Sequence, residues 1–334
     1  MSFGNNKKVV ITGGSGFIGT NLVEYLANHV WEVENFDIKP PVNRVYTDYW
    51  RRVDVMDKDG FIKALDEFSP GTLVHLAART NIDESGSLDD YALNTIGVSN
   101  VIEAVNQTHS IERTILCSSQ LVCRIGYKPT LDDDYCPDTL YGLSKSQGEQ
   151  IVRRSDFNRS TWTIIRPTSI WGPWFDIPYK NFFETIQQKR YFHPSHMKTY
   201  KQWGYVGNTV YEIAKILEAG SENIDRQTFY IADFEPVLLE EFANGIREEF
   251  GNQKIRRLPG WFFKIAGLIG DMLSRIGLKN FPMTSFRFRN MITDELCDSS
   301  SLELIVGKLP FTLKEGISNT IDWMRKNERY GKSI

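Results

Sequence analysis

The sequence is poor in cysteine, and no group of metal-ligating residues stands out in it. Four cysteines occur among the 334 residues, at positions 117, 123, 136 and 297. Their spacing is typical neither of a disulfide framework nor of a zinc site. His193 and His196 lie three residues apart, but no neighbouring residues complete a set of metal ligands. We therefore expect neither disulfides nor a bound metal.

The sequence also lacks a strong charge of either sign. It has 39 Lys and Arg residues against 42 Asp and Glu residues, for a formal net charge of −3, and no block of like charges. A nucleic acid is therefore not an expected partner. Residues 1–8 hold no apolar signal segment, which predicts a cytoplasmic protein.

No apolar run is long enough and clean enough to predict a membrane span. Residues 258–277 are rich in Trp, Phe, Leu and Ile, but Lys264, Asp271 and Arg275 interrupt them at helical spacing. This pattern favours an amphipathic helix packed against the protein body, with attachment to a membrane interface as the weaker alternative. We therefore expect no membrane partner.

What the sequence does contain begins with residues 8–19, KVVITGGSGFIG. A β-branched run stops at glycines and a helical pattern follows, which predicts a strand, a tight turn and a helix. Gly14, Gly16 and Gly19 fit the pattern G-x-G-x-x-G, and Gly13 adds a fourth residue without a Cβ. Side chains here would obstruct the approach of the backbone to a pyrophosphate, which the helix N-terminus attracts.

A second predicted strand, from 31 to 36, ends in Asp37, 18 residues after Gly19. An acid at this place accepts hydrogen bonds from an adenosine ribose and repels the 2′-phosphate of NADP, so NAD is the expected cofactor. Lys39, two residues later, weakens that preference.

Strands alternate with helices as far as Pro167. The pattern predicts strands at 50–55, 72–76, 113–118 and 161–166, and helices at 58–68, 88–107 and 138–155. This alternation is typical of an α/β fold with a doubly wound parallel sheet, the Rossmann architecture. We expect an NAD-binding domain over 1–167 and a smaller, mainly substrate-binding part over 168–334. The segment from about 201 to 232 is expected to return to the main sheet, with a strand at 227–231, and a closing helix is expected at 312–327.

Tyr141 and Lys145 are four residues apart on the predicted helix 138–155, so both point to one side of it. Ser119 follows a strand expected to end beside them. Together they suit proton transfer to or from a substrate hydroxyl while hydride passes to nicotinamide. Tyrosine has an ordinary pKa of about 10, and lowering it to neutrality requires about 4 kcal/mol of preferential stabilisation of the phenolate. Lys145 and the charge of oxidised nicotinamide are the available sources.

These motifs resemble those of the extended short-chain dehydrogenases/reductases of the NAD-dependent epimerase/dehydratase type, over nearly the whole chain. TGGSGFIG (12–19) resembles the cofactor turn, HLAA (75–78) the fourth-strand motif, and RPTSIWGP (166–173) the segment that leads to the substrate region. The resemblance implies a catalytic set of Ser119, Tyr141 and Lys145. It implies cofactor contacts from Gly13, Gly16, Phe17, Ile18, Gly19, Asp37, Asp54, Val55, Leu76, Ala77, Ala78, Asn94, Tyr141 and Lys145.

Departures from the family pattern narrow the reaction. Dehydratases and decarboxylases of the family are expected to place an acid in one or both positions after the active-site hydroxyl, and this chain has Gln120 and Leu121. Neither can protonate a leaving hydroxyl, so dehydration is disfavoured. By resemblance, the expected substrate contacts are Arg79, Ser169, Lys201, Arg287 and Arg289, with Lys201 at the place of a diphosphate-binding arginine.

The leading hypothesis is a 4-epimerase or 4-keto reductase that acts on a nucleotide-activated sugar with NAD. The alternatives are a dehydrogenase for a hydrophobic alcohol, because residues 259–289 resemble the 3β-hydroxysteroid dehydrogenase branch, and an NAD sensor without turnover. The resemblance also suggests a homodimer formed through the helices at 88–107 and 138–155 of each subunit.

Overall fold

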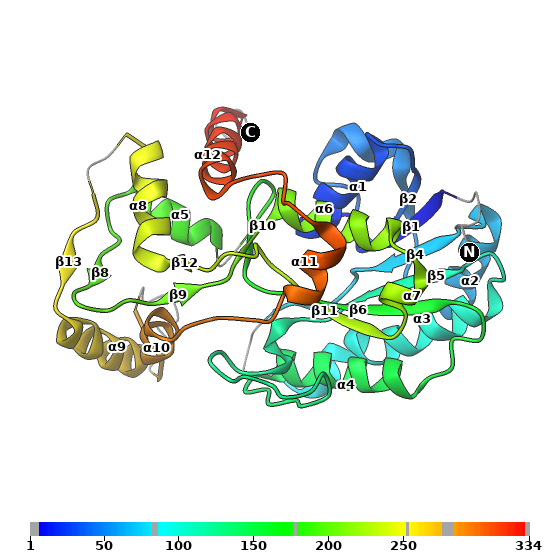
Figure 1. The fold of residues 1–334 in the computed structure, drawn as a ribbon, viewed down its shortest axis with the longest axis horizontal. Coiled ribbons are helices and arrows are strands. Elements are labelled where there is room, and N and C mark those ends of the chain that lie inside the picture. Colours follow the sequence, from blue (N-terminus) through cyan, green and yellow to red (C-terminus); the bar gives the residue numbers. More distant parts are fainter. Residues whose placement is uncertain (1–6, 82–85, 177–178, 252–253, 276–282, 331–334) are drawn as a thin grey trace. The chain divides into compact units, whose positions relative to one another are not determined.

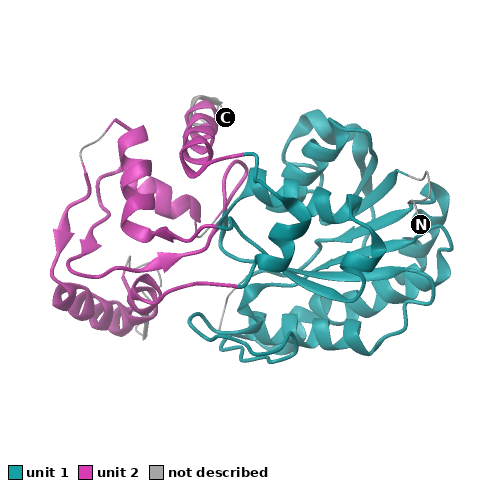
Figure 2. Cartoon of the chain, in the orientation of Figure 1, with its two compact units in different colours: residues 1–170, 204–234, 298–310 teal, residues 171–203, 235–297, 311–334 magenta. Residues whose placement is uncertain are grey.

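The computed structural model describes residues 7–81, 86–176, 179–251, 254–275 and 283–330. The chain divides into two compact units (Figure 2). Unit 1 comprises residues 1–170, 204–234 and 298–310, and unit 2 comprises residues 171–203, 235–297 and 311–334. The chain therefore leaves unit 1 and returns to it twice before it ends in unit 2.

Unit 1 is built on a seven-stranded sheet in the order β11-β6-β5-β4-β1-β2-β3 (Figure 1). All neighbouring strands are parallel. The strands are β1 (Lys8–Thr12), β2 (Glu32–Asp37), β3 (Trp50–Arg52), β4 (Thr72–His75), β5 (Arg113–Cys117), β6 (Thr161–Pro167) and β11 (Gln227–Ile231). The strand order reverses at β1 and β4, which confirms the predicted doubly wound sheet and locates the crevice where such folds bind ligands.

Helices cover both faces of this sheet. On one face α1 contacts α6, which contacts α11, and on the other α2, α3 and α4 pack in sequence. Their bounds are α1 (Phe17–Ala27), α2 (Lys58–Phe68), α3 (Ile96–Gln107), α4 (Leu140–Arg154), α6 (Val206–Glu218), α7 (Ser221–Ile224) and α11 (Ser300–Val306). Short elements complete the unit: η1 (Arg44–Tyr49), η2 (Leu88–Asn94), η3 (Gln120–Val122) and β10 (Gly204–Tyr205). The two-residue strand β7 (Ile170–Trp171) lies where the chain passes into unit 2. Apolar side chains of the sheet and of α2, α3 and α4 form a fully buried core.

The prediction of one continuous helix over 88–107 is wrong. The segment is a 3₁₀ helix, η2, followed by α3, and the two meet at Thr95, whose φ of −125° and ψ of −67° are not helical. The side chain of Asn94 is engaged with the backbone of Arg79 and with Ser144. The helix is thus interrupted next to a residue whose side chain binds the segment after β4 and helix α4.

Unit 2 is smaller and has little sheet. Its helices are α5 (Tyr179–Gln187), α8 (Leu239–Glu249), α9 (Gly260–Arg275), α10 (Ser285–Ile292) and α12 (Leu313–Tyr330). Its strands are β8 (His193–Pro194) paired parallel with β13 (Arg257–Leu258), and β9 (Tyr200–Lys201) paired antiparallel with β12 (Val237–Leu238). Aromatic rings form the centre, with Phe242 in contact with Trp171, Phe183 and Trp203. Helix α12 confirms the predicted closing helix. In the described part of the chain, no helix combines the length and apolarity needed to cross a membrane.

Two acids meet in unit 1 beside β11. Asp233 accepts hydrogen bonds from the backbone of Tyr205 and the amide of Asn208, at 3.2 and 2.9 Å. Burial nevertheless raises the pKa of Asp233 to about 6. Burial first and the nearby Asp233 second raise the pKa of Glu212, which lies fully buried on α6.

We expect Asp233→Asn to change how stability depends on pH. The folded pKa lies above the unfolded one, so between about pH 4 and 6 the native state binds the extra proton and stability falls as pH rises. A shift of about two pKa units corresponds to roughly 2–3 kcal/mol. The unfolding free energy of the variant minus that of the wild type should therefore be larger at pH 7 than at pH 4 by that amount. Urea denaturation at both pH values measures it. An equal difference at the two values would contradict this assignment.

Candidate active site

The turn after β1 is packed directly against the end of β4. Gly13 has φ +72°, a region that favours glycine, and a Cβ there would lie 2.6 Å from the backbone nitrogen of Ala77. A Cβ on Gly14 would lie 2.3 Å from the amide oxygen of Asn35. Glycine is thus required at both positions by the protein's own packing.

The same turn is fastened to the end of β2. The backbone N–H of Ser15 donates to the carboxylate of Asp37 at 3.1 Å, and the Ser15 hydroxyl donates to the carbonyl of Lys39 at 2.8 Å. The buried amide of Asn35 donates to the Ser15 hydroxyl at 3.1 Å. Asp37 is therefore held at the turn, where sequence spacing predicted it. The supporting roles of Ser15 and Asn35 were not anticipated, and no sequence signal marks them beyond their nearness to the glycines.

The N-terminus of α1 is suited to a pyrophosphate. Gly16, its N-cap, is exposed and makes no side-chain cap, and the first turn carries no acid. The positive end of the helix dipole therefore remains available to an anion. Phe17 and Ile18, in the first turn, are partly buried, and Gly19 packs against the turn, where a Cβ would lie 2.3 Å from the Gly13 carbonyl oxygen. These features fit a dinucleotide.

The other predicted cofactor residues lie around the carboxyl ends of β3 and β4. Leu76, Ala77 and Ala78 follow β4 and are partly accessible. Val55 is buried, and the exposed carboxylate of Asp54 accepts the backbone N–H of Met56 at 2.9 Å. Residues 76–78 therefore lie beside the strand-order reversal between β1 and β4, whereas Asp54 and Val55 follow the edge strand β3.

Asn94, predicted as a cofactor contact, also holds two segments of the chain together. It accepts the N–H of Arg79 at 2.9 Å and donates to the Arg79 carbonyl and the Ser144 hydroxyl, at 3.0 and 2.9 Å. It thereby joins the segment after β4 to α4. The guanidinium of Arg79 donates to the Asp90 carbonyl at 3.0 Å and lies over the ring of Tyr91.

The structure brings Ser119, Tyr141 and Lys145 together, as the spacing predicted. Ser119 caps η3, accepting the N–H of Leu121 at 3.1 Å, and its hydroxyl is hydrogen-bonded to that of Tyr141. Lys145 donates to the carbonyl of Cys117, the last residue of β5, at 2.8 Å. Gly142 allows this arrangement, because a Cβ there would lie 2.1 Å from the Leu121 carbonyl oxygen.

Burial controls the protonation of this group. It raises the pKa of the Tyr141 phenol, nearby Cys117 and Tyr91 add to that effect, and the hydrogen bond with Ser119 opposes it. Burial lowers the pKa of the Lys145 ammonium, which Cys117 and Glu149 partly offset. The chain by itself therefore favours a neutral phenol next to an ammonium that is more easily deprotonated than usual.

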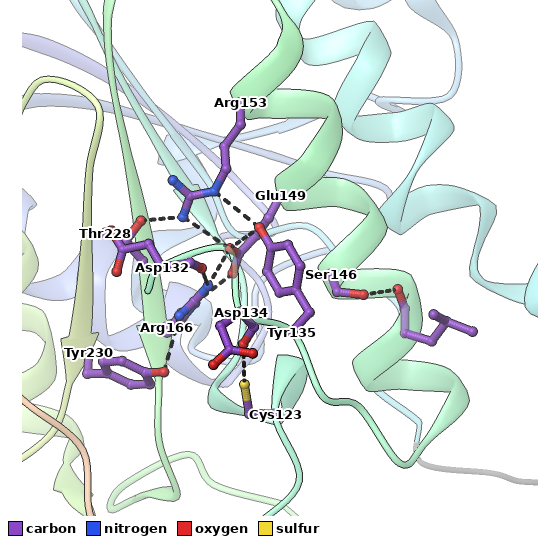
Figure 3. Close-up of polar contacts among 11 residues, drawn as sticks. Cys123, Asp132, Asp134, Tyr135, Ser146, Glu149, Arg153, Arg166, Thr228 and Tyr230 are labelled. Carbon is purple, nitrogen blue, oxygen red and sulfur yellow. Dashed lines mark hydrogen bonds and ion pairs between the residues drawn. The ribbon is translucent and has the colours of Figure 1, made fainter. Parts of the chain in front are cut away.

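A buried ion pair joins α4 to β6 (Figure 3). Glu149, one turn after Lys145, accepts from Arg166 of β6 at 2.8 and 2.7 Å, and both side chains are about 2% exposed or less. Arg166 also donates to the Asp132 carbonyl and, at 3.1 Å, to the Tyr230 hydroxyl. Tyr135 donates to Glu149 at 3.1 Å. The network thus links α4, β6, β11 and the loop that follows η3. Sequence reasoning missed Glu149, although its spacing of four from Lys145 and eight from Tyr141 places it on their helix face.

The predicted substrate residues are dispersed between the two units. Ser169 is buried in unit 1 and its carbonyl accepts the N–H of Gly204 at 3.1 Å. In unit 2, Lys201 is buried and donates to the carbonyls of Asn290 and Thr293 and to Glu295, at 2.8, 2.9 and 3.3 Å. A diphosphate would have to compete with these partners, so the geometry does not favour that role for Lys201. Arg287 and Arg289 lie exposed on α10.

Comparison with known proteins agrees with this geometry. The sequence of residues 9–232 matches the NAD dependent epimerase/dehydratase family. The chain belongs to this family and is an enzyme whose cofactor is NAD.

Similar proteins include several epimerases. The N-acetyl-alpha-D-glucosaminyl-diphospho-ditrans,octacis-undecaprenol 4-epimerase of Escherichia coli O157:H7 is 27% identical over 95% of each chain. A 3beta-hydroxysteroid-dehydrogenase/decarboxylase of Arabidopsis thaliana is 26% identical over 94% of this chain and 78% of its own. The Thermus thermophilus UDP-glucose 4-epimerase, solved with NAD, superimposes with a TM-score of 0.70 at 20% identity, over 95% of this chain and 99% of its own. The structural likeness confirms the fold.

Proposed function

We propose that this protein is a 4-epimerase that oxidises and re-reduces one hydroxyl carbon of a nucleotide-activated sugar. The observation that carries the proposal is the Ser119, Tyr141 and Lys145 group at the carboxyl end of β5, in the same unit as the glycine turn and Asp37. Relatives named as 4-epimerases support the choice of reaction. A sensor would not need a proton-transfer group.

Each residue has a definite task in this reaction. The glycine turn and Asp37 would hold NAD, which would supply a hydride acceptor for the sugar carbon, the same hydride for its reduction, and a positive charge that favours phenolate. Tyr141 takes the hydroxyl proton as the carbonyl forms and returns it when the carbon is reduced. Ser119, hydrogen-bonded to Tyr141, orients the substrate oxygen, and Lys145 favours the phenolate by its charge. Gln120 and Leu121 offer no acid to expel water, which disfavours dehydration and leaves oxidation and reduction at one carbon.

Two other substrates deserve direct comparison. The Escherichia coli relative, matched over 95% of both chains, is named for a sugar carried on a prenyl diphosphate. The Arabidopsis relative is named for a steroid. A sugar on a prenyl diphosphate and a nucleotide sugar both contain a diphosphate. As an alternative substrate, we therefore rank the prenyl diphosphate sugar above a sterol.

Conversion assays separate these reactions. The purified protein with NAD would be incubated with UDP-, GDP- and dTDP-sugars, with a prenyl diphosphate sugar and with a 3β-hydroxysteroid. An epimerase yields an isomer of equal mass with no net absorbance change at about 340 nm, the nicotinamide signal of NADH. Conversion of the steroid alone, with NADH formation, would overturn the proposal. Binding of NAD with no conversion of any compound would favour the sensor.

We further propose that the enzyme is a cytoplasmic homodimer. Its four cysteines are free thiols, which suits a reducing compartment. A groove of about 640 Å³ runs along η2, α3 and α4, and more of its surface is apolar than polar. Ile96, 54% exposed, and Ile151 line it. A second copy of the same surface would cover these side chains.

Replacing Ile96 by lysine is expected to weaken this dimer at least tenfold, because a charge would be buried in the seam. Sedimentation equilibrium at micromolar concentration measures the effect. Val45→Lys is the matched control, since Val45 is 79% exposed on η1 and lies outside the groove. A wild-type protein that sediments as a monomer would refute the dimer.

A further inference from the structure

Helix α9 has an apolar side that unit 2 leaves uncovered. Six large apolar side chains on it are between 47% and 68% exposed: Trp261, Phe262, Ile265, Leu268, Ile269 and Met272. At 100° per residue they fall within an arc about 120° wide, a continuous stripe along the helix. We call this set the α9 stripe. Large exposed apolar surfaces of this kind mark binding sites.

The opposite side of α9 accounts for its packing. Phe263 is buried and stacks on Phe288 of α10, with 5.8 Å between ring centroids. Gly267 lies against α10 so closely that a Cβ would be 3.1 Å from the backbone nitrogen of Ser285. The helix is therefore anchored through one side, and the α9 stripe is directed away from that contact. The sequence pattern predicted an amphipathic helix packed against the protein body. That prediction describes the side of α9 that contacts α10, but not the α9 stripe.

The charged residues of α9 and of its neighbour α10 are mostly positive. Lys264 on α9 and Arg287 and Arg289 on α10 are exposed. Arg289 lies over the ring of Phe286, which is itself 42% exposed. The one acid of α9, Asp271, accepts the backbone N–H of Ser285 at 3.1 Å and so faces α10. Helices α9 and α10 thus combine exposed apolar side chains with exposed cations, which complements a surface that is apolar inside and anionic outside.

We propose that the α9 stripe binds the surface of a lipid bilayer that contains anionic lipid. The helix has 16 residues, about 24 Å at 1.5 Å per residue, which is shorter than the roughly 30 Å hydrocarbon core. It lies along the interface and does not cross it. Trp261 and Phe262 at its start are of the types enriched at that depth, and the cations meet the headgroups.

Charge favours this occupant over a second copy of the chain. Stripe-to-stripe contact would bring together two α9–α10 pairs, each with more cations than acids, and like charges repel. An anionic bilayer instead gains from the same cations. The proposal concerns binding alone and holds whichever sugar the enzyme converts.

Vesicle flotation tests it with the full chain. Wild-type protein is expected to float with vesicles of phosphatidylcholine and phosphatidylglycerol, to bind vesicles of pure phosphatidylcholine more weakly, and to be released by salt. The double variant Leu268→Gln with Met272→Gln should bind at least tenfold more weakly. Leu304→Gln is the matched control, because Leu304 is 89% exposed on α11 and lies outside the stripe. Circular dichroism and thermal melting check that both variants fold.

Three results would overturn the proposal. The first is wild-type protein that floats with neither vesicle. The second is a double variant that folds and floats like the wild type. The third is self-association of the wild type that the double variant abolishes while neither protein binds vesicles, which would make the stripe a contact between copies.

Discussion

Tyr141→Phe is expected to lower kcat by about 10²–10⁴, because the variant keeps the ring but lacks the hydroxyl group that transfers the proton. The fold should survive, since the ring still packs near Tyr91 and only the hydrogen bond between the phenol and Ser119 is lost. Steady-state conversion of the sugar substrate measures the loss. Calorimetric titration with NAD is expected to give a Kd within about threefold of the wild type, a difference of about 0.65 kcal/mol.

Tyr127→Phe is the control for this change. The Tyr127 hydroxyl donates to Asp134 at 2.8 Å, outside the catalytic group. The same atom is removed in both variants, so a loss confined to Tyr141→Phe assigns the effect to its position. Full activity of Tyr141→Phe would remove the phenol from the mechanism.

Arg166→Met is expected to cost about 3–5 kcal/mol of unfolding free energy, because it strands the buried carboxylate of Glu149. Burial alone would lower the pKa of Arg166, but the hydrogen bonds and charge of Glu149 raise it, so Glu149 stabilises the charged guanidinium. Denaturant unfolding measures the change. Activity should fall as well, since Glu149 lies on α4 with Tyr141 and Lys145.

Arg153→Met provides the matched comparison. Arg153 approaches the same carboxylate at 3.5 Å but is 20% exposed, so its loss should cost about 1 kcal/mol or less. The pair Glu149→Gln with Arg166→Met should be more stable than Arg166→Met alone, because no buried charge remains. Equal losses of unfolding free energy for the two arginine variants would show that burial of the ion pair does not determine its contribution to stability.

Local patterns in the sequence were sufficient for the sheet and for the placement of Tyr141 and Lys145 on one helix face. A strand that ends in glycines, an acid at the end of the next strand and a four-residue spacing on one helix each depend on neighbours in the chain. Asp37, Tyr141 and Lys145 were found in this way, and the structure holds all three in unit 1.

Features that depend on distant partners could not be predicted. Glu149 and Arg166 are 17 residues apart on different elements, and no local pattern predicts that they pair. The break at Thr95 lies beside an asparagine engaged with a backbone 15 residues earlier. The partners of Lys201 are about 90 residues away, so a basic residue expected to meet a phosphate was found beside Glu295 instead.

The route of the chain between the units limits how this enzyme can be made and dissected. The backbone passes from one unit to the other five times, after residues 170, 203, 234, 297 and 310. No single proteolytic cut releases either unit. A fragment ending at residue 170 would lack β11, so β6 would become an unpaired edge strand, which promotes aggregation. The ribosome must deliver residue 310 before unit 1 is complete, so its final assembly awaits nearly the whole of synthesis.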